Sequence, residues 1–241
     1  MSHRFYLPQL ESDAPLVLDG DQAHHALQVM RFGVGDTITL FDGQGIEYRA
    51  RIESIGKRRL ELQRLERIES DSELPVDLSL AVALPKGDRQ KWLVEKLVEL
   101  GVRRLIPLET ERGVAAVNPK VRTRLEKQVI EASKQCHRNR LISIEPAQSL
   151  ETLVAWAQEA LPPEASTWIG DPRGGFPAEQ IRGPAHLILI GPEGGFSEEE
   201  LERANNSGAK SMSLGPAVLR VETAALAAAA IVGRVAMSTN A

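Results

Sequence analysis

The hydrophobic pattern of the chain changes at Pro75, and this change limits the folds that the chain can adopt. Before Pro75, short β-rich segments separated by glycine-containing turns are expected at 37–41, 46–55 and 60–65, which is typical of a small barrel or sandwich. After Pro75, apolar strands alternate with longer helical periods, which is typical of an α/β domain with a largely parallel sheet. The charged segment 66–75 is the expected linker, so the 241 residues are predicted to form two domains.

The hydrophobic pattern after Pro75 predicts strands and helices in alternation. It begins with a strand at 78–84, followed by a helix that Asp88 can cap and that Gly101 ends. Further strands are expected at 105–108, 167–170 and 186–190, and further helices at about 119–137, 149–160 and 221–237. In the first domain, one helix is expected at about 21–31, with Asp21 as its N-cap.

Charge is distributed unevenly along the chain. The net charge of −4 argues against a nucleic-acid partner when the chain is taken as a whole. Segment 103–140, however, carries ten Lys and Arg residues against four Asp and Glu residues. Such a basic segment favours sequence-independent binding of nucleic-acid phosphates, and the alternative interpretation is a solvated helix face. The cations of this segment include Arg103, Arg112, Lys120, Arg122, Arg124, Lys127, Lys134, Arg138 and Arg140.

The cysteine, histidine and hydropathy patterns exclude several classes of protein. Cys136 is the only cysteine, so an internal disulfide and a cysteine-cluster metal site are excluded, and we expect Cys136 to be a small helix residue. The five histidines show no metal-ligand spacing, so no metal is expected. The longest apolar stretch, 224–232, is too short to cross a bilayer, and the N-terminus lacks the apolar centre of a signal peptide. We therefore expect a cytoplasmic protein with no membrane partner.

The sharpest motif runs from 186 to 200 and reads as an apolar strand, a glycine-rich turn and a helix start. Ser197 and Glu200 have the spacing of a capping box, which fixes the first residue of that helix. The glycines between 191 and 195 allow a ligand to approach the backbone at the end of the strand. The phosphate-loop signatures are absent, and Glu193 with the glutamates after it would repel a polyphosphate. An equal alternative is that this turn only connects the strand to the helix and binds no ligand.

A second glycine turn, 214–223, leads directly into an alanine-rich helix. Buried polar groups beside an apolar helix need partners, so Arg220, Glu222 and Thr223 form either a structural hydrogen-bond cluster or part of a site. The helix is apolar on every face between 224 and 232, which is expected for a helix surrounded by protein. Either a second subunit or the core of a monomer would surround it.

At these motifs the chain resembles the RsmE-type ribosomal RNA methyltransferases, which methylate a uridine at N3 in small-subunit ribosomal RNA. The resemblance spans nearly the whole chain and rests on the order and spacing of several motifs. These motifs are Arg4-Phe-Tyr6, Gly35-Asp36, Phe41-Asp-Gly43, Leu84-Pro-Lys-Gly-Asp-Arg89, Lys96 with Glu99-Leu-Gly-Val102, Glu111-Arg112, Glu131-Ala-Ser-Lys-Gln-Cys136 with Arg138, Gly191-Pro-Glu-Gly-Gly195 and Leu214-Gly-Pro-Ala-Val-Leu-Arg-Val-Glu-Thr-Ala224. The chain departs from the family at His137, where a small residue is expected, and at Val221, where threonine is expected.

The resemblance implies an α/β fold with two domains. A small N-terminal PUA-like RNA-binding β-barrel would occupy residues 1–72, and a C-terminal SPOUT-type methyltransferase domain with a deep trefoil knot would occupy residues 73–241. General rules of topology reject knots, so the knot is expected from the resemblance alone. The resemblance also implies a homodimer, S-adenosylmethionine as cofactor, and 16S ribosomal RNA in an assembled or late-assembling small subunit as substrate.

The resemblance also implies roles for particular residues. The cofactor would bind at Ile169, Ile190, Gly191, Pro192, Glu193, Gly194, Gly195, Leu214, Gly215, Leu219 and Thr223. RNA would be bound by Arg4, His24, Arg31, Lys86, Arg89, Arg112 and Arg138. Methylation at N3 requires loss of the imide proton, so we expect Arg220 to stabilise negative charge on the ring oxygens. Glu222 is expected to orient Arg220 or to accept the proton.

Two functions of other classes are the alternatives to a methyltransferase. A non-catalytic RNA-binding protein on the same scaffold would bind RNA without binding S-adenosylmethionine. A small-molecule enzyme that uses the glycine turn for a nucleotide would be insensitive to salt, whereas RNA binding weakens steeply with added salt. The two intact glycine turns favour the methyltransferase over the non-catalytic RNA-binding protein.

Overall fold

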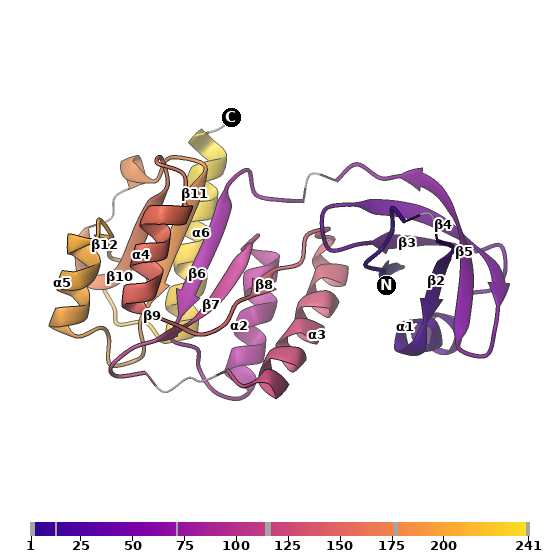
Figure 1. Ribbon diagram of the computed structural model, residues 1–241, viewed down its shortest axis with the longest axis horizontal. Coiled ribbons are helices and arrows are strands. Elements are labelled where there is room, and N and C mark those ends of the chain that lie inside the picture. Colours follow the sequence, from indigo (N-terminus) through magenta and orange to yellow (C-terminus); the bar gives the residue numbers. More distant parts are fainter. Residues whose placement is uncertain (1–2, 13, 71, 114–116, 176–177, 240–241) are drawn as a thin grey trace. The chain divides into compact units, whose positions relative to one another are not determined.

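The computed structural model describes residues 3–12, 14–70, 72–113, 117–175 and 178–239. The chain divides into two compact units, of which the first comprises 1–73 with 133–141 and the second comprises 74–132 with 142–241 (Figure 1). The sequence prediction, which divided the chain into 1–72 and 73–241, assigned residues 133–141 to the second domain, whereas in the structure they belong to the first unit. The Arg4 guanidinium explains their place in the first unit, because its Nη1 donates a hydrogen bond to the Ser133 carbonyl at 2.9 Å.

The first unit is built on a five-stranded sheet with the strand order β1-β3-β4-β5-β2. The strands are β1 (Arg4–Tyr6), β2 (Leu16–Asp19), β3 (Thr37–Phe41), β4 (Glu47–Ile55) and β5 (Arg59–Arg67). β1 pairs with β3 in parallel, and the other neighbours are antiparallel. The expected helix is α1 (Gly20–His24), continued by a π-helical turn, η1 (His25–Val29). Apolar side chains from the sheet and from α1, including Phe5, Ala23 and Ile38, form the core of the unit.

The second unit is a parallel sheet covered by helices on both faces, as the alternating pattern predicts. Its strand order is β12-β10-β11-β6-β7-β8, with β9 paired to β7, and every pair is parallel. The strands are β6 (Asp77–Val82), β7 (Arg104–Glu109), β8 (Ser143–Ile144), β9 (Gln148–Ser149), β10 (Ser166–Gly175), β11 (Ala185–Ile190) and β12 (Lys210–Met212).

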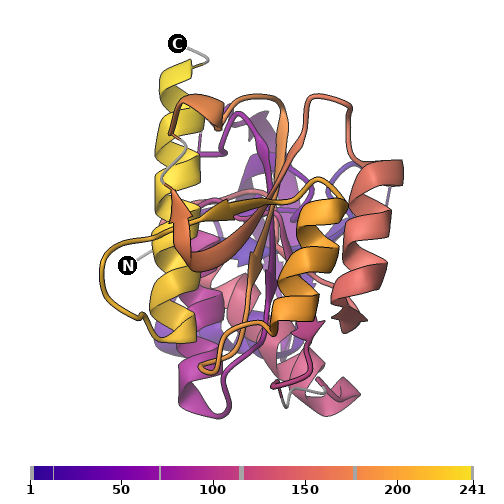
Figure 2. The same ribbon diagram turned by 90° about the vertical axis from the view of Figure 1, so that its left-hand side faces the viewer.

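The helices of the second unit lie on opposite faces of the sheet. α2 (Asp88–Glu99) and α6 (Val221–Thr239) cover one face, and α4 (Leu150–Ala160) and α5 (Glu198–Asn206) cover the other (Figure 2). A short 3₁₀ turn, η2 (Ala178–Gln180), precedes β11, and the long helix α3 (Pro119–Cys136) follows β7. All six residues of β11 are buried, as expected for a strand covered on both faces. Since the strands are parallel, the loops after β10, β11 and β12 meet at one edge.

The helix starts agree with the sequence in one place and differ in two. The capping box at Ser197 and Glu200 is confirmed, because each side chain accepts a hydrogen bond from the backbone N–H of the other. Asp88 is not an N-cap: Gly87 holds that position with a φ of 69°, and Asp88 is the first helical residue. There its charge still interacts favourably with the helix dipole. Asp21 is not an N-cap either: the N-cap of α1 is Asp19, and Asp21 lies in the first turn of the helix.

One face of the alanine-rich helix α6 packs into the core of the second unit. By length and composition, Val221–Ser238 is long and apolar enough to cross a membrane, and 44% of this window is buried within the protein. This window is longer than the unbroken apolar stretch 224–232, because it includes the polar residues on either side of that stretch. α6 contacts β6, β11 and α2, and Ala225, Ala228 and Val232 on this face are completely buried.

Candidate functional site

A pocket of about 290 Å³ lies at the carboxyl edge of the sheet in the second unit. Its walls are formed by residues 170–172 within β10, by the ends of β11 and β12 with the loops that follow them, and by the start of α6. Its lining residues are Gly170, Asp171, Pro172, Ile190, Gly191, Pro192, Glu193, Gly194, Gly195, Met212, Leu214, Gly215, Ala217, Val218, Leu219, Val221 and Ala224. We call it the glycine-turn pocket, because both glycine turns that the sequence singled out contribute to it.

Most of the predicted cofactor residues line this pocket, and two do not. Ile169 is completely buried in the core cluster beneath the pocket, and its neighbour Gly170 forms the wall instead. Thr223 is exposed to solvent and does not line the pocket. Sequence reasoning also missed Asp171, whose carboxylate side chain is only 11% exposed. Its position directly after a predicted strand was the available signal.

The first glycine turn is held in shape by its own backbone and by a buried carboxylate. Gly195 adopts a φ of 67° and donates a backbone hydrogen bond to the Pro192 carbonyl at 2.8 Å, a conformation that glycine adopts without strain. The Glu200 carboxylate accepts hydrogen bonds from the backbone N–H of Ser197 at 2.8 Å and of Glu111 at 3.0 Å. Glu200 thus joins the turn to the segment after β7.

Arg112 also holds this turn. Its Nη1 donates to the Gly194 carbonyl at 2.9 Å and lies 3.5 Å from the Phe196 carbonyl oxygen. The sequence assigned Arg112 to RNA binding. In the structure its guanidinium contacts two carbonyl groups of the glycine turn, and the residue remains exposed. Arg112 is therefore a solvent-facing cation that also holds the wall of the pocket.

Arg89, at the start of α2, lies between two carboxylates. Its Nη1 is 3.4 Å from Oε1 of Glu193 in the first glycine turn and 3.6 Å from Oε1 of Glu222 at the start of α6. The Glu222 side chain is only 8% exposed, and its Oε2 has no hydrogen-bond partner among the described residues. The ion-pair partner of Glu222 is therefore Arg89, not Arg220 as the sequence suggested. The exposed Arg220 has no side-chain partner in the described part of the chain.

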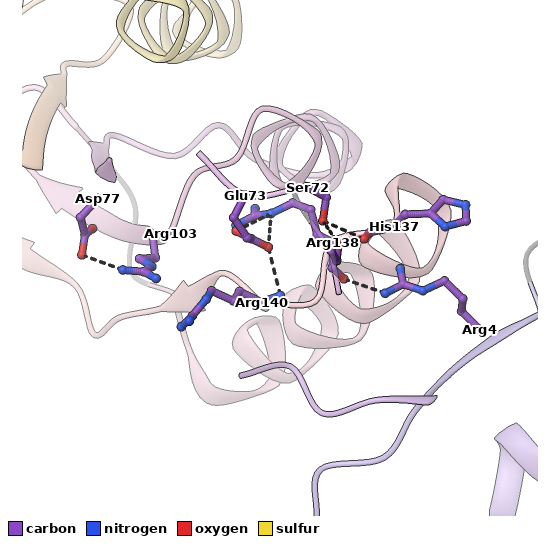
Figure 3. Close-up of polar contacts among 9 residues, drawn as sticks. Arg4, Ser72, Glu73, Asp77, Arg103, His137, Arg138 and Arg140 are labelled. Carbon is purple, nitrogen blue, oxygen red and sulfur yellow. Dashed lines mark hydrogen bonds and ion pairs between the residues drawn. The ribbon is translucent and has the colours of Figure 1, made fainter. Parts of the chain in front are cut away.

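Two of the predicted RNA-binding cations, Arg4 and Arg138, are buried in the first unit, and Figure 3 shows Arg138 beside its carboxylate partner Glu73. Arg4 is 4% exposed, and its Nε donates to Glu47 at 2.9 Å. Arg138 is 2% exposed, and its Nη2 donates to Glu73 at 2.7 Å. Neither guanidinium is accessible to a phosphate, so we revise both assignments to structural roles. The sequence could not show that these cations have carboxylate partners far along the chain.

The remaining predicted RNA contacts, His24, Arg31 and Lys86, are exposed. Arg31 adopts a φ of 60°, which is uncommon for a residue with a side chain. Among the described residues, no group of three or more His, Cys, Asp or Glu side chains could hold a metal ion. Cys136 is half-buried and is the last residue of α3.

Comparison with known proteins places both units in one class. Residues 72–233 match the RNA methyltransferase domain family, and residues 18–63 match the RNA methyltransferase PUA domain family. The fold and the glycine-turn pocket together thus define an RNA methyltransferase.

Individual relatives give the same class with more detail. The chain is 30% identical over 233 residues to the ribosomal RNA small subunit methyltransferase E of Bacillus subtilis, covering 90% of this chain and 89% of the relative. A crystal structure of a ribosomal RNA small subunit methyltransferase E from Neisseria gonorrhoeae bound to S-adenosyl methionine is 33% identical, with a TM-score of 0.84 and 97% of both chains covered. A putative methyltransferase from Legionella pneumophila in complex with bound S-adenosylmethionine is 30% identical, with a TM-score of 0.84, covering 97% and 98% of the two chains. The chain belongs to the ribosomal RNA small subunit methyltransferase E family, as its motifs indicated.

Proposed function

We propose that this protein transfers the methyl group of S-adenosylmethionine to N3 of a uridine in 16S ribosomal RNA of the small subunit. The observation that carries the proposal is the glycine-turn pocket, which two glycine turns form at the carboxyl edge of the sheet. Relatives with 33% and 30% identity over nearly the whole chain bind S-adenosylmethionine. When bound, this cofactor supplies an activated methyl group on a sulfonium.

The residues of the pocket suit such a cofactor. Ile190, Leu214 and Leu219 offer apolar surface for an adenine ring, and the backbone between 191 and 195 offers N–H and carbonyl groups. The largely buried Asp171 carboxylate can accept hydrogen bonds from hydroxyl or ammonium groups. Methyl transfer depends mainly on placing donor and acceptor in line, so a rigid pocket can supply much of the barrier reduction.

Arg220 and Glu222 are proposed to act on the uridine. Arg220 is exposed and has no side-chain partner among the described residues, so its guanidinium is available to stabilise negative charge on a uracil oxygen as the N3 proton leaves. Glu222 is held by Arg89 through one oxygen, and its other oxygen has no described partner. That second oxygen is our candidate acceptor for the N3 proton. Arg89 then serves as a positioning residue for Glu222.

The RNA would be bound by exposed cations of both units. In the second unit, Lys86 and Arg112 follow β6 and β7 at the edge of the sheet that carries the glycine-turn pocket. In the first unit, His24 and Arg31 are exposed on or just after the helical segment. Contacts of this kind give salt-dependent affinity for the phosphate backbone. The substrate is proposed to be an assembled or late-assembling small subunit in the cytoplasm.

The chain after β12 is proposed to pass through a deep trefoil knot of the SPOUT type. Support comes from the order of elements, because β12 is the edge strand of the sheet. The next helix, α6, nevertheless packs against β6 and β11, further inside the sheet. The residues between β12 and α6 also line the glycine-turn pocket. Threading at this point would fix both glycine turns around the cofactor.

The protein is further proposed to be a homodimer that uses the outward face of α6. This face carries the half-buried Ala227 and Ile231 and the exposed Ala230, and near its end Met237 is 48% exposed. Contact with a second copy would bury this apolar surface. Light scattering tests the proposal, because a mass of 26.4 kDa in solution, that of one chain, would refute it.

Methyl incorporation into small ribosomal subunits tests the proposed activity. The subunits are taken from a strain that lacks the protein, incubated with the protein and labelled S-adenosylmethionine, digested with nuclease and analysed by mass spectrometry. We expect labelled 3-methyluridine. Cofactor binding without incorporation would refute the proposed substrate, and RNA binding without cofactor binding would favour the non-catalytic RNA-binding protein instead.

A further inference from the structure

We propose that the first unit contains a binding pocket for an unpaired RNA base, separate from the glycine-turn pocket. A cavity of about 650 Å³ is formed entirely by residues of the first unit, from β1, β3, β4, the segment 68–70 and the end of α3. We call it the base pocket. Its volume falls in the range of sites for small organic molecules. The inference rests on the proposed function, because it concerns the same RNA substrate.

The floor of the base pocket is rigid and carries no net charge. Arg4 and Glu47 line it and form a buried ion pair at 2.9 Å. Three more of its five N–H donors bond to the carbonyls of Ser133 and Arg138 and to the Asn139 side chain. Since these bonds occupy the guanidinium, Arg4 does not attract a phosphate. The floor instead fixes the spacing of the walls around it.

His137 stands at the rim of the base pocket in an unusual conformation. It follows the last residue of α3 with a φ of 64°, a position where glycine is most favourable. The Ser72 hydroxyl donates to its backbone carbonyl at 3.0 Å, and the imidazole points away from the Arg138–Glu73 pair (Figure 3). A residue kept in a conformation that disfavours its side chain indicates a role for that side chain. Because the His137 side chain is exposed and lines the base pocket, we infer that its role is to bind a ligand there.

The side chains around the base pocket favour a nucleobase over a phosphate. His3 and His137 provide two imidazole rings, which are among the groups that stack on unpaired RNA bases. Gln135 and Thr39 provide uncharged donors and acceptors for a base edge. The exposed Glu69 carboxylate has no side-chain partner among the described residues and repels phosphate. As an acceptor, Glu69 favours bases with an exocyclic amino group, so adenine should bind better than uracil.

Binding of short RNA strands to the full-length protein tests this proposal. Fluorescence anisotropy at one salt concentration compares labelled oligoadenylate and oligouridylate of equal length. We expect oligoadenylate to bind more tightly, and His137→Gly and Gln135→Ala each to weaken its binding about five-fold or more. The matched control is Gln63→Ala, an exposed glutamine on β5 outside the base pocket, which should bind like the unaltered protein.

Two further measurements separate the possible failures. The melting temperature of His137→Gly should not fall, since glycine suits this position, so weaker RNA binding would not reflect unfolding. S-adenosylmethionine affinity should be equal in all four proteins. Equal RNA affinities in all four, or tighter binding of oligouridylate, would overturn the base pocket while leaving the proposed function intact. If the unaltered protein binds neither S-adenosylmethionine nor small subunits, the proposed function fails, and the base pocket proposal fails with it.

Discussion

The Arg89 guanidinium lies 3.6 Å from Oε1 of Glu222, which joins the start of α2 to the start of α6. The same nitrogen lies 3.4 Å from Glu193 in the first glycine turn. One arginine thus connects the buried carboxylate to the wall of the glycine-turn pocket. This arrangement holds the carboxylate through Oε1, whereas the buried Oε2 has no hydrogen-bond partner among the described residues.

Replacing Glu222 by glutamine should remove the proposed proton acceptor with little change of shape. We expect the rate of methyl transfer at saturating substrates to fall about 100-fold or more, with an unchanged affinity for S-adenosylmethionine. Single-turnover assays and calorimetry measure the two quantities. Glu199→Gln, an exposed glutamate on α5, is the control and should keep full activity. A rate for Glu222→Gln equal to that of the control would exclude Glu222 as the proton acceptor.

Arg220→Ala should abolish methyl transfer and keep cofactor binding. The reason is that the Arg220 guanidinium is proposed to stabilise negative charge that develops only as the N3 proton leaves, an effect typically worth about 100-fold or more in rate. Arg182→Ala, which alters an exposed arginine outside the pocket, serves as the control. Equal losses of rate and of cofactor affinity would reassign Arg220 to cofactor binding.

Arg112→Ala should weaken cofactor binding even when no RNA is present. Arg112 holds the Gly194 carbonyl at 2.9 Å, and a hydrogen bond from a charged donor is worth enough that its loss should reduce affinity about ten-fold. Calorimetry with S-adenosylmethionine alone gives the measurement. An unchanged affinity combined with weaker RNA binding would instead support the role that the sequence predicted. The cofactor affinity of Arg112→Lys should lie between those of the unaltered protein and Arg112→Ala, since lysine keeps the charge without the planar fork.

The sequence predicted the parts of the site that depend on local pattern. Alternating strands and helices indicated the parallel sheet, and the turn at 191–195 and the second turn at 214–219 do line the glycine-turn pocket. On the β10 side of the pocket only Ile169 was predicted, because Asp171 and Met212 come together only through the pairing of β10 with β12, where Gly170 is opposite Met212. Such pairing between distant segments leaves no signal in local periodicity.

The errors about cations have a related cause. In the sequence, Arg4 and Arg138 look like the other arginines of a basic RNA-binding protein. Their carboxylate partners, Glu47 and Glu73, are 43 and 65 positions away, so nothing near either arginine in the sequence indicated burial. A cation that is buried with its hydrogen bonds satisfied stabilises a fold, whereas a cation on the surface remains available to a phosphate.

His186 should make the stability of the second unit depend on pH. Burial lowers the pKa of His186 to about 4, and its neutral ring accepts a hydrogen bond from the Trp168 indole at 3.5 Å. The ordinary pKa is near 6.5, so between pH 6.5 and 4 the unfolded chain binds the proton that the folded chain excludes. Stability from this group is therefore complete above pH 6.5 and falls as the pH decreases, by about 2 kcal/mol at pH 5.

Urea unfolding of the native protein and of His186→Gln at pH 7.5 and pH 5 measures this effect. Other titrating groups contribute equally to both proteins, so the difference between the two pH dependences isolates the histidine. We expect the native protein to lose more stability than the variant between these pH values. Equal losses would show that the imidazole is protonated as readily in the folded state as in the unfolded state.

His137→Gly should stabilise the first unit. The backbone of His137 has a φ of 64° after the end of α3, a conformation that is strained for a residue with a Cβ atom and unstrained for glycine. Glycine also gives the unfolded chain more freedom, which offsets part of the gain, so we expect a net increase of about 0.5–1 kcal/mol in the free energy of unfolding. His137→Ala, which removes the imidazole and keeps the Cβ atom, is the control and should not be stabilised. If glycine and alanine have equal effects, the left-handed backbone stores no strain, and the conformation of His137 then indicates no role for its side chain.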